Sequence, residues 1–510
     1  MTTALLALPV LLPVLAGGVC LLTHHRLPLR VLSVTVLVAV LVDAAALLAL
    51  ADDRGPLVLH VGGWAAPAGI ALVADRLSAL LLSVAVLVAL AVLLFAIGQG
   101  TAEERSHETA VFHPGYLLLV AGVSLAFLTG DLFNLFVAFE VMLASSYILL
   151  TLDAGRPRTR AGMTYTMTSL TSSLLFLTAI ALVYAATGTV TLAQLGGRLA
   201  ALPDGLRTAL SLLLLVVFGI KAALVPLHFW LPDSYPTAPA PITAVFAALL
   251  TKVGMYALLR TQTLLFPRSE TWVLLAVAAV AAMLVGVLGA VAQDDINRLL
   301  SFTLVGHMGY MLFGLALFDV AGLTGTILYM VHHIVVQAAL FLAAGLILRQ
   351  TGTSALHRMQ ERTPPTAVVA ALFAVPALSV AGVPPLSGFV AKLALLQASA
   401  ADGHPAAYLL AGAAVLTSLL TLYAMARLWR RVFFATRQAR RRPHGPGRHG
   451  PGRRATVLML GAATGMAVAG LGVAAAAGPL AGVGERAAED LRHPEPYREA
   501  VLDGLAEGGR

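Results

Sequence analysis

Long apolar runs alternate with short polar loops along almost the whole chain of 510 residues. A bilayer-spanning helix needs about 20 mostly apolar residues, because no water is present there to satisfy a non-helical backbone. About 14 runs reach that length. They lie near residues 3–23, 31–51, 77–98, 114–130, 132–152, 162–187, 208–230, 239–261, 271–292, 299–318, 321–348, 366–400, 406–429 and 455–479. The pattern predicts an all-α polytopic membrane protein with no room for a sizeable soluble domain.

The composition points to the same class. Hydrophobic residues make up 59% of the chain and charged residues 11%, whereas soluble domains carry about 45–50% and about 25%. The single cysteine, Cys20, excludes an intrachain disulfide framework and any Cys-based zinc or iron–sulfur site. No Walker-type phosphate loop is found either. We therefore expect no cofactor, and energy that comes from an ion gradient or from a partner.

The distribution of the residues behind the net charge of +8 indicates how the chain is oriented in the membrane. Arginines are concentrated in the loops after odd-numbered spans, which places those loops in the cytoplasm and both termini outside. The most basic segment, 427–454, carries the pentapeptide His-Gly-Pro-Gly-Arg twice. We interpret it as a flexible cytoplasmic loop touching anionic lipid, not as a nucleic-acid site. The polar tail, 484–510, is expected to be a short amphipathic or disordered end.

Lysine is rare and confined to the spans. Only three of the 33 basic residues are lysine, namely Lys221, Lys252 and Lys392, and all three lie inside apolar runs. Arginine is always protonated, whereas a lysine removed from water can lose its proton. Charged side chains in the bilayer interior are costly and usually functional. The three lysines therefore indicate proton transfer; the alternative for each is a helix-end lysine that snorkels to the interface.

Glu140 is the one glutamate well inside a predicted span. A carboxylate near a buried lysine would keep the amine charged, and a proton arriving nearby would change both groups. An inert structural ion pair is the alternative. Asp43 is a weaker candidate, with helix packing or an interfacial position equally plausible, and Asp131 and Asp319 fall at span ends.

Helix-breaking residues gather beside two of the lysines. Five prolines follow Lys221 between 226 and 241, and prolines and glycines between 376 and 388 precede Lys392. Two discontinuous helices are expected there, and paired breaks are typical of transport sites built from repeats. Glu140 to Lys221 is 81 residues and His307 to Lys392 is 85. Spans four to eight and nine to thirteen therefore suggest two five-helix units, inverted because each has an odd number of spans.

Histidines form a third set of candidates. His307, His332 and His333 lie within predicted spans, and an ordinary imidazole titrates near neutrality. Adjacent residues point about 100° apart on a helix, so at most one of His332 and His333 is expected to face a given path. A haem or metal site is the weaker interpretation, since no acidic cluster accompanies these rings.

Four stretches within about residues 110–430 resemble a known family. They are DLFNLFVAFEVMLASSYILL, FGIKAALVPLHFWLPDSYPTAPAPITAVFAALLTKVGMYAL, YMVHHIVVQAALFLAAG and PPLSGFVAKLALL. They resemble the D subunit of multisubunit (Mrp-type) Na⁺/H⁺ antiporters, which is similar to the antiporter-like subunits of respiratory complex I and of membrane-bound hydrogenases. Within WLPDSYPTAPAP, Ser234, Tyr235 and Thr237 favour the antiporter over complex I.

The resemblance implies a 14-helix subunit with two inverted five-helix repeats, two broken helices and a central line of charged residues. Glu140 would pair with Lys221, Lys252 would link the halves, and Lys392 would end the second half-channel, with His332 and His333 on the helix between. It also implies assembly with other antiporter subunits in a bacterial plasma membrane, H⁺ and Na⁺ as the transported ions, and no enzymatic activity. The site residues expected for proton transfer are Glu140, Lys221, Lys252, His332, His333, Lys392 and, as a further candidate, His307.

One position departs from the family pattern. Relatives commonly carry a lysine four residues after the second histidine, where this chain has Gln337. Glutamine can hydrogen-bond a water chain but cannot take up a proton. Proton passage at this position would depend on His333 and water, so Gln337 is expected to affect proton conduction through the second half-channel.

The resulting division of the chain assigns residues 1–110 to three N-terminal helices, 111–265 and 266–433 to the two repeats, 434–454 to the basic loop, and 455–510 to the last span and tail. The functional hypothesis is a proton-translocating subunit of a Na⁺/H⁺ antiporter. Two alternatives remain open: a proton-pumping subunit of a complex I-type or hydrogenase complex, and a scaffold whose charges only hold helices together.

Overall fold

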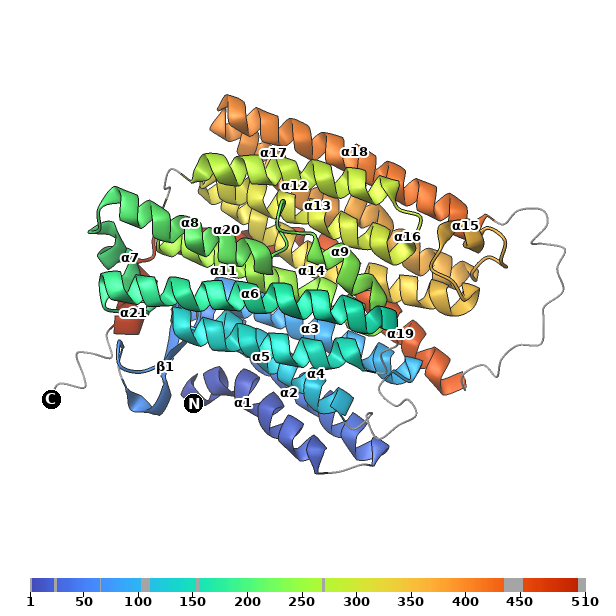
Figure 1. Ribbon diagram of the computed structural model, residues 1–510, viewed down its shortest axis with the longest axis horizontal. Helices are drawn as coiled ribbons and strands as arrows, with labels where there is room; N and C mark the ends of the chain where they lie inside the picture. The colour runs from blue at the N-terminus through green and yellow to red at the C-terminus, as the bar shows by residue number, and fades with distance from the viewer. Residues whose placement is uncertain are drawn as a thin grey trace.

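A computed structural model describes residues 2–22, 25–64, 66–101, 111–152, 156–267, 271–434 and 453–502. The basic loop expected at 434–454 lies almost wholly outside these ranges. The described chain is a bundle of roughly parallel helices with one small hairpin, β1 (Leu57–His60) antiparallel to β2 (Ala71–Ala74), joined through η1 (Val61–Gly63) (Figure 1).

The first half of the bundle contains α1 (Thr2–Leu21), α2 (Arg26–Arg54), α3 (Arg76–Gln99), α4 (Phe112–Leu128), α5 (Leu132–Thr151), α6 (Arg156–Thr187), α7 (Leu192–Ala200), α8 (Asp204–Lys221), α9 (Trp230–Ser234), η3 (Tyr235–Thr237), α10 (Ala240–Val245), η4 (Phe246–Leu250) and α11 (Thr251–Leu264). The second half contains α12 (Trp272–Ala292), α13 (Ile296–Leu317), α14 (Val320–Thr351), α15 (Leu356–Met359), α16 (Ala367–Ala381), α17 (Ser387–Asp402), α18 (Pro405–Phe433), α19 (Arg453–Ala475), α20 (Ala477–Arg492) and α21 (Glu495–Leu502).

The described residues hold 11 helical segments long and apolar enough to cross a membrane. The shorter apolar helix α4 is a twelfth crossing, and the broken segments α8–α9 and α16–α17 are the thirteenth and fourteenth. The all-α polytopic fold predicted from the apolar runs is confirmed.

Several spans begin at an aspartate cap. The Oδ1 atoms of Asp75, Asp131, Asp295 and Asp319 each accept a hydrogen bond from the backbone N–H three residues later, at 2.9, 2.6, 3.0 and 2.6 Å. Such caps satisfy amides that the first helical turn leaves unbonded. The expectation that Asp131 and Asp319 stand at span ends is therefore confirmed.

Both expected discontinuities are present. α8 ends at Lys221, and the backbone does not resume helix until Trp230. α16 ends at Ala381, and α17 begins at Ser387. Lys221 therefore closes the helix before its break, whereas Lys392 lies just over one turn inside the helix that follows its own break.

A pair of backbone links recurs along the chain. Leu132 N–H donates to Val190 O, and Leu192 N–H donates to Gly130 O. In the second half, Ile296 N–H donates to Ser354 O, and Leu356 N–H donates to Asp294 O. Each of these four residues lies 164 positions after its counterpart in the first half. The short helices beside the two links, α7 and α15, lie at opposite ends of the bundle (Figure 1). This arrangement is what an inverted repeat produces.

That register changes one detail of the sequence interpretation. A shift of 164 residues matches Glu140 with Leu304 rather than with His307, which lies nearly one turn further along α13. The ionisable groups of the two halves therefore do not occupy equivalent positions, although the backbone that carries them repeats.

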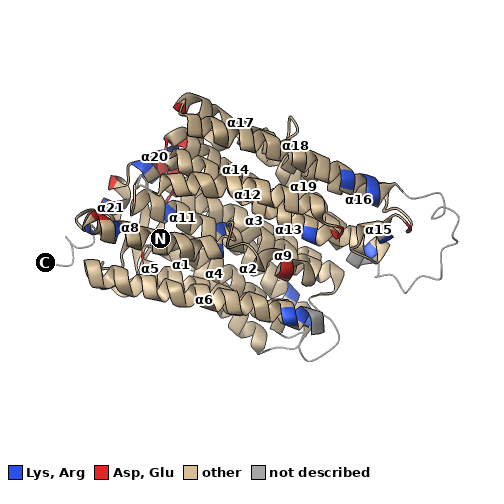
Figure 2. Cartoon of the chain, turned by 45° about the horizontal axis from the view of Figure 1, so that its top comes forward, with Lys and Arg blue, Asp and Glu red and all other residues tan. Residues whose placement is uncertain are grey.

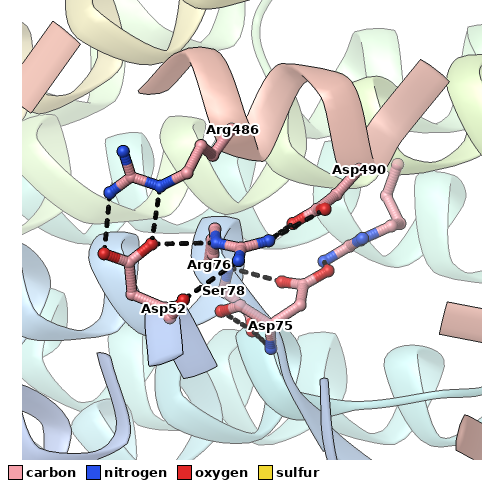
Figure 3. Close-up of polar contacts among 7 residues, drawn as sticks. Asp52, Asp75, Arg76, Ser78, Arg486 and Asp490 are labelled. Carbon is pink, nitrogen blue, oxygen red and sulfur yellow. Dashed lines mark hydrogen bonds and ion pairs between the residues drawn. The ribbon is translucent and has the colours of Figure 1, made fainter. Parts of the chain in front are cut away.

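The C-terminal tail is helical through residue 502 and docks on the bundle. Asp52 of α2 accepts bonds from Arg486 at 2.7 and 2.9 Å and from Arg76 Nε at 2.9 Å (Figure 3). Arg76 also donates to both carboxylate oxygens of Asp490, at 2.8 and 3.0 Å. The amphipathic alternative for the tail is correct for the described part, and these ion pairs fix its position.

A more deeply buried pair lies beside that network. Arg260 Nη2 of α11 and Asp75 Oδ2 are 2.6 Å apart, with side chains only 8% and 4% exposed. Arg260 also lies over the ring of Tyr497 in α21, with its Cζ 5.3 Å from the ring centroid. One ion pair thus joins the start of α3, the end of α11 and the tail.

Positions of charged residues, coloured on the ribbon, gather at the two ends of the bundle and are sparse in its middle (Figure 2). The end that carries α15 and the start of α6 shows mainly lysine and arginine. The end with α20 and α21 shows both signs. This distribution agrees with a cytoplasmic first end and an outer second end.

Replacing Arg260 with alanine is predicted to lower the free energy of unfolding by about 3–5 kcal/mol, because it leaves the buried Asp75 carboxylate without a countercharge. The matched control is Arg207→Ala. Arg207 pairs with Asp204 at 2.7 Å, but the two side chains are 37% and 88% exposed, and such a pair contributes at most about 1 kcal/mol. Unfolding of both variants in mixed micelles measures the difference, and equal losses would contradict the prediction.

Candidate proton-transfer line

The first cluster joins α5, α6 and α8. Ser173 Oγ donates to Glu140 Oε1, and Lys221 Nζ donates to Ser173 Oγ at 2.9 Å. The Lys221 ammonium also lies 5.3 Å from the centroid of the Phe139 ring. Glu140 and Lys221 are therefore brought together, as the sequence predicts, but a serine hydroxyl joins them. A hydroxyl both donates and accepts, so it can pass a proton between its two neighbours.

Lys221 owes its position to the end of α8. Ala223, two residues on, has φ +53°, and Pro226 follows, so the helix cannot continue. The unbonded carbonyls at a helix C-terminus carry partial negative charge, which favours an ammonium group there. The residues that end α8 and the charge of Lys221 thus belong to one local structure.

A small cavity lies beside Lys221. Its volume is about 30 Å³, and its wall includes Tyr165, Trp230 and Leu250. A water molecule requires about 10–15 Å³ of cavity volume when the volume is that open to the centre of the water. The cavity therefore provides room for water between the end of α8 and η4, the turn just before Lys252.

Lys252 is fully buried. Its Nζ donates to Ala247 O at 2.5 Å, a carbonyl within the π-helical turn η4, and lies 3.4 Å from Thr251 Oγ1. A π-turn changes the helical bonding pattern and is common at functional sites. Gly254 lets α11 approach α8 closely, because a Cβ there would be 2.6 Å from Ala222 N. Snorkelling to the interface is excluded for Lys252.

The histidines form an aromatic cluster between α13 and α14. His307 Nδ1 is hydrogen-bonded to Tyr329 OH, and the His307 and His333 rings stack with centroids 5.0 Å apart. His332 Nδ1 and Ser387 Oγ are hydrogen-bonded at 2.8 Å. The 100° offset gives His332 and His333 different partners, yet both rings lie against Tyr329.

Lys392 ends the cluster at the second helix break. Its Nζ donates to Val380 O at 2.9 Å and to Ala381 O at 3.2 Å, the last carbonyls of α16. It also lies 4.8 Å from the centroid of the Tyr310 ring, which stacks on Tyr329. Lys392 thus binds a helix C-terminus across the break, through the same electrostatic preference that acts on Lys221.

Several buried polar atoms of this cluster have no hydrogen-bond partner among the described residues. They are Nε2 of His307, Nε2 of His332, both ring nitrogens of His333 and Oε1 of Gln337. Gln337 Nε2 donates to Leu300 O at 3.1 Å. These atoms are the positions at which a water chain would bond, and Gln337 offers an acceptor where relatives are expected to offer an amine.

The described line therefore runs through Glu140, Ser173, Lys221, Lys252, the histidine cluster and Lys392. Within the described part of the chain, Lys252 bonds Ala247 and Thr251 rather than Lys221 or a histidine, although it lies within electrostatic range of His333. Among the described residues, no three His, Cys, Asp or Glu side chains lie together as metal ligands would.

Three residues that contact these ionisable groups could not be anticipated from sequence. Ser173 is one of many hydroxyl residues in α6, and only its bonds to Glu140 and Lys221 distinguish it. Tyr329 and Ser387 look like ordinary core residues until the fold brings them against His307 and His332. Asp43, the weaker candidate, is buried on α2 with neither carboxylate oxygen bonded within the described part of the chain.

A bundle of membrane-spanning helices with two breaks and a line of buried and half-buried ionisable residues defines the class of ion-translocating membrane subunits. Residues 129–421 match the family model described as "NADH:quinone oxidoreductase/Mrp antiporter, TM". The chain belongs to this family.

Individual members of this family show which of its proteins the chain is similar to. The chain is 41% identical over 435 residues to the D subunit of the Na⁺/H⁺ antiporter of Alkalihalophilus pseudofirmus, covering 84% of this chain and 87% of that protein. A chain of the Mrp complex from a Dietzia species superposes with a TM-score of 0.88 at 34% identity, covering 98% and 100% of the two chains. A chain of respiratory complex I from Thermus thermophilus superposes with a TM-score of 0.78 at 25% identity, covering 98% and 100%.

Replacing Gly382 with alanine is predicted to destabilise the protein more than the same change at Gly403. Both glycines end helices at positive φ, +88° and +69°, so both variants bear the same backbone cost of about 1–2 kcal/mol. Only at Gly382 would the new Cβ meet a neighbour, Lys392 Cδ at 2.9 Å; at Gly403 nothing lies within 4 Å. Thermal unfolding in detergent measures the difference, and equal shifts would show that Lys392 is not held tightly.

Proposed function

We propose that this chain is the proton-conducting subunit of a multisubunit Na⁺/H⁺ antiporter in a bacterial plasma membrane. The observation that carries the proposal is the series of ionisable residues inside the bundle, from the half-buried Glu140 and Lys221 through the buried Lys252 and histidines to the buried Lys392. The Na⁺/H⁺ antiporter names of two of its relatives supply the exchange partner, Na⁺. His332 and His333 act between Lys252 and Lys392, with His307 supporting them.

The chemistry follows from low dielectric. A proton on Glu140 weakens its attraction for the Lys221 ammonium, so the amine can release its own proton toward the cavity and Lys252. Lys252 and Lys392 bond neutral carbonyls rather than carboxylates, so no fixed countercharge holds either one ionised. Positive charge on one repels charge on the next, which passes the change of state along the line.

Each part of the chain has its own task under this proposal. We assign residues 111–265 to the first half-channel, 266–433 to the second, 1–110 and 455–510 to the surrounding helices and tail, and 434–454 to a cytoplasmic loop. The other antiporter subunits are the partners, Na⁺ need not pass through this chain, and the tail end of the bundle faces outside.

The alternative is a proton-pumping subunit of a redox-driven complex. Identity to the complex I chain is 25%, against 34–41% to the antiporter chains, over comparable shares of their length. The antiporter assignment is therefore favoured.

Glu140→Gln, Lys221→Ala and Lys392→Ala are each predicted to abolish Na⁺-dependent dissipation of ΔpH in everted vesicles that carry the whole complex. Each change removes a group that binds the proton, whereas the helices keep their apolar packing. Asp204→Asn, at an exposed carboxylate, is the control. Complex recovered by affinity purification must stay near the wild-type amount; exchange that persists would reject the relay, and loss of assembly would favour the scaffold alternative.

Ser173→Ala is predicted to lower the exchange rate by about tenfold or more, because it removes the hydroxyl between Glu140 and Lys221. The neighbouring Ser172→Ala is a close control: Ser172 is fully buried and donates to Val217 O at 3.2 Å, outside the line. Exchange rates at matched expression test this prediction. Equal effects of the two substitutions would mean that packing, not proton transfer, depends on these serines.

A further inference from the structure

A pocket of about 440 Å³ lies at the tail-side ends of α5 and α6. Its wall is formed by residues 67–70 before β2, by the start of α5, by the last turns of α6, and by Val190 and Thr191. Asp131 is the one acidic residue in that wall. This is the end that the arginine distribution assigns to the outside.

Asp131 caps α5 with only one of its two carboxylate oxygens. Its Oδ1 accepts a bond from Asn134 N–H, but its Oδ2 is buried and has no hydrogen-bond partner among the described residues. The residue is only 5% exposed. Burial raises the pKa of the Asp131 carboxyl to about 6, although the amides of Asn134 and Phe133 act in the opposite direction. A helix cap uses one oxygen, so the second is available for another purpose.

The charged surroundings do not hold this carboxyl ionised. Tyr497 of α21 lies within electrostatic range of Asp131, and next to it are Arg260 and Asp75, which neutralise each other at 2.6 Å. Arg198 of α7 donates to Thr187 O. Residues 66–74 and the pocket wall on α6 contain no charged side chain.

The pocket wall and the Glu140–Ser173 pair lie along the same faces of α5 and α6. On α6, Leu177, Ala181 and Tyr184 of the pocket wall lie 4, 8 and 11 positions after Ser173, which is the spacing of one helical face. On α5, Phe133 of the wall lies seven positions before Glu140, on the same face. At about 1.5 Å per helical residue, the α6 wall of the pocket runs from about 6 Å (Leu177) to about 16 Å (Tyr184) beyond Ser173, so its near edge lies about one turn from the Glu140–Ser173 bond.

We propose that Asp131 is a proton-loading site in this outer pocket, supplying protons from the outside medium to Glu140. The proposal rests on the proposed function and extends it to the point where protons are taken up. A proton fits better than Na⁺, because one free carboxylate oxygen in a mainly apolar wall favours the neutral acid, whereas hard cations require several oxygen ligands.

The repeat supplies a matched control. Asp295 caps α13 as Asp131 caps α5, forms the equivalent backbone bridge, and lies 164 residues later. Asp295 is only half-buried, and neither of its carboxylate oxygens is among the buried, unbonded side-chain atoms of the described residues. Asparagine is as good a cap as aspartate, so Asp131→Asn and Asp295→Asn alter the two helix starts equally and differ only in the buried oxygen.

The test uses everted vesicles that carry the whole complex, loaded at luminal pH values between about 5 and 8, a range that spans the titration of a raised aspartate. The initial rate of ²²Na⁺ uptake is measured, and each variant is divided by wild type so that the driving force cancels. Asp131→Asn should lower the rate about tenfold, Asp131→Glu should keep most of it with a shifted pH midpoint, and Asp295→Asn should match wild type.

Three results would overturn the proposal. The first is wild-type rate and pH profile in Asp131→Asn while Glu140→Gln remains inactive, which leaves the proposed function standing. The second is an equal loss in Asp295→Asn, which means capping alone. The third is protection of Asp131 from labelling by a hydrophobic carbodiimide when Na⁺ is added at constant pH, which means a metal-cation site. An active Glu140→Gln would instead reject the proposed function itself.

Discussion

The structure depends on how an ammonium group is accommodated where the bilayer supplies no water. Lys252 and Lys392 each bond a backbone carbonyl that a π-turn or a helix end makes available. Unsatisfied charge at this depth is expensive, so the two broken helices and the π-turn are the means by which these amines are tolerated. The breaks and the lysines therefore form one feature of the fold.

The same constraint separates two kinds of buried charge. Arg260 and Asp75 at the tail-side end form a tight ion pair that holds α3, α11 and the tail together. The lysines in the interior instead bond neutral acceptors, and Glu140 reaches Lys221 only through Ser173. A fixed pair serves assembly, whereas weakly compensated groups can change protonation, which is what a relay requires.

The repeat shows how one backbone can carry different chemistry in its two halves. The backbone links at Leu132 and at Ile296 are the same in both halves, with every residue offset by 164 positions. Within that frame the first half presents a carboxylate near its broken helix, and the second presents histidines and tyrosines. Asp131 and Asp295 illustrate the same divergence, since they share a cap and differ in burial.

The sequence by itself determined the spans, the breaks and the membrane location of Glu140, Lys221, Lys252 and Lys392, because hydropathy and proline placement act locally along the chain. It could not identify Ser173, Tyr329 or Ser387, since their partners come from other helices 33, 22 and 55 residues away. It also left the tail undecided, because the Arg76–Asp490 pair joins residues 414 positions apart. Tertiary packing decided these contacts. Hydropathy indicates that a helix is buried, but only the arrangement of the helices determines which groups each polar atom contacts.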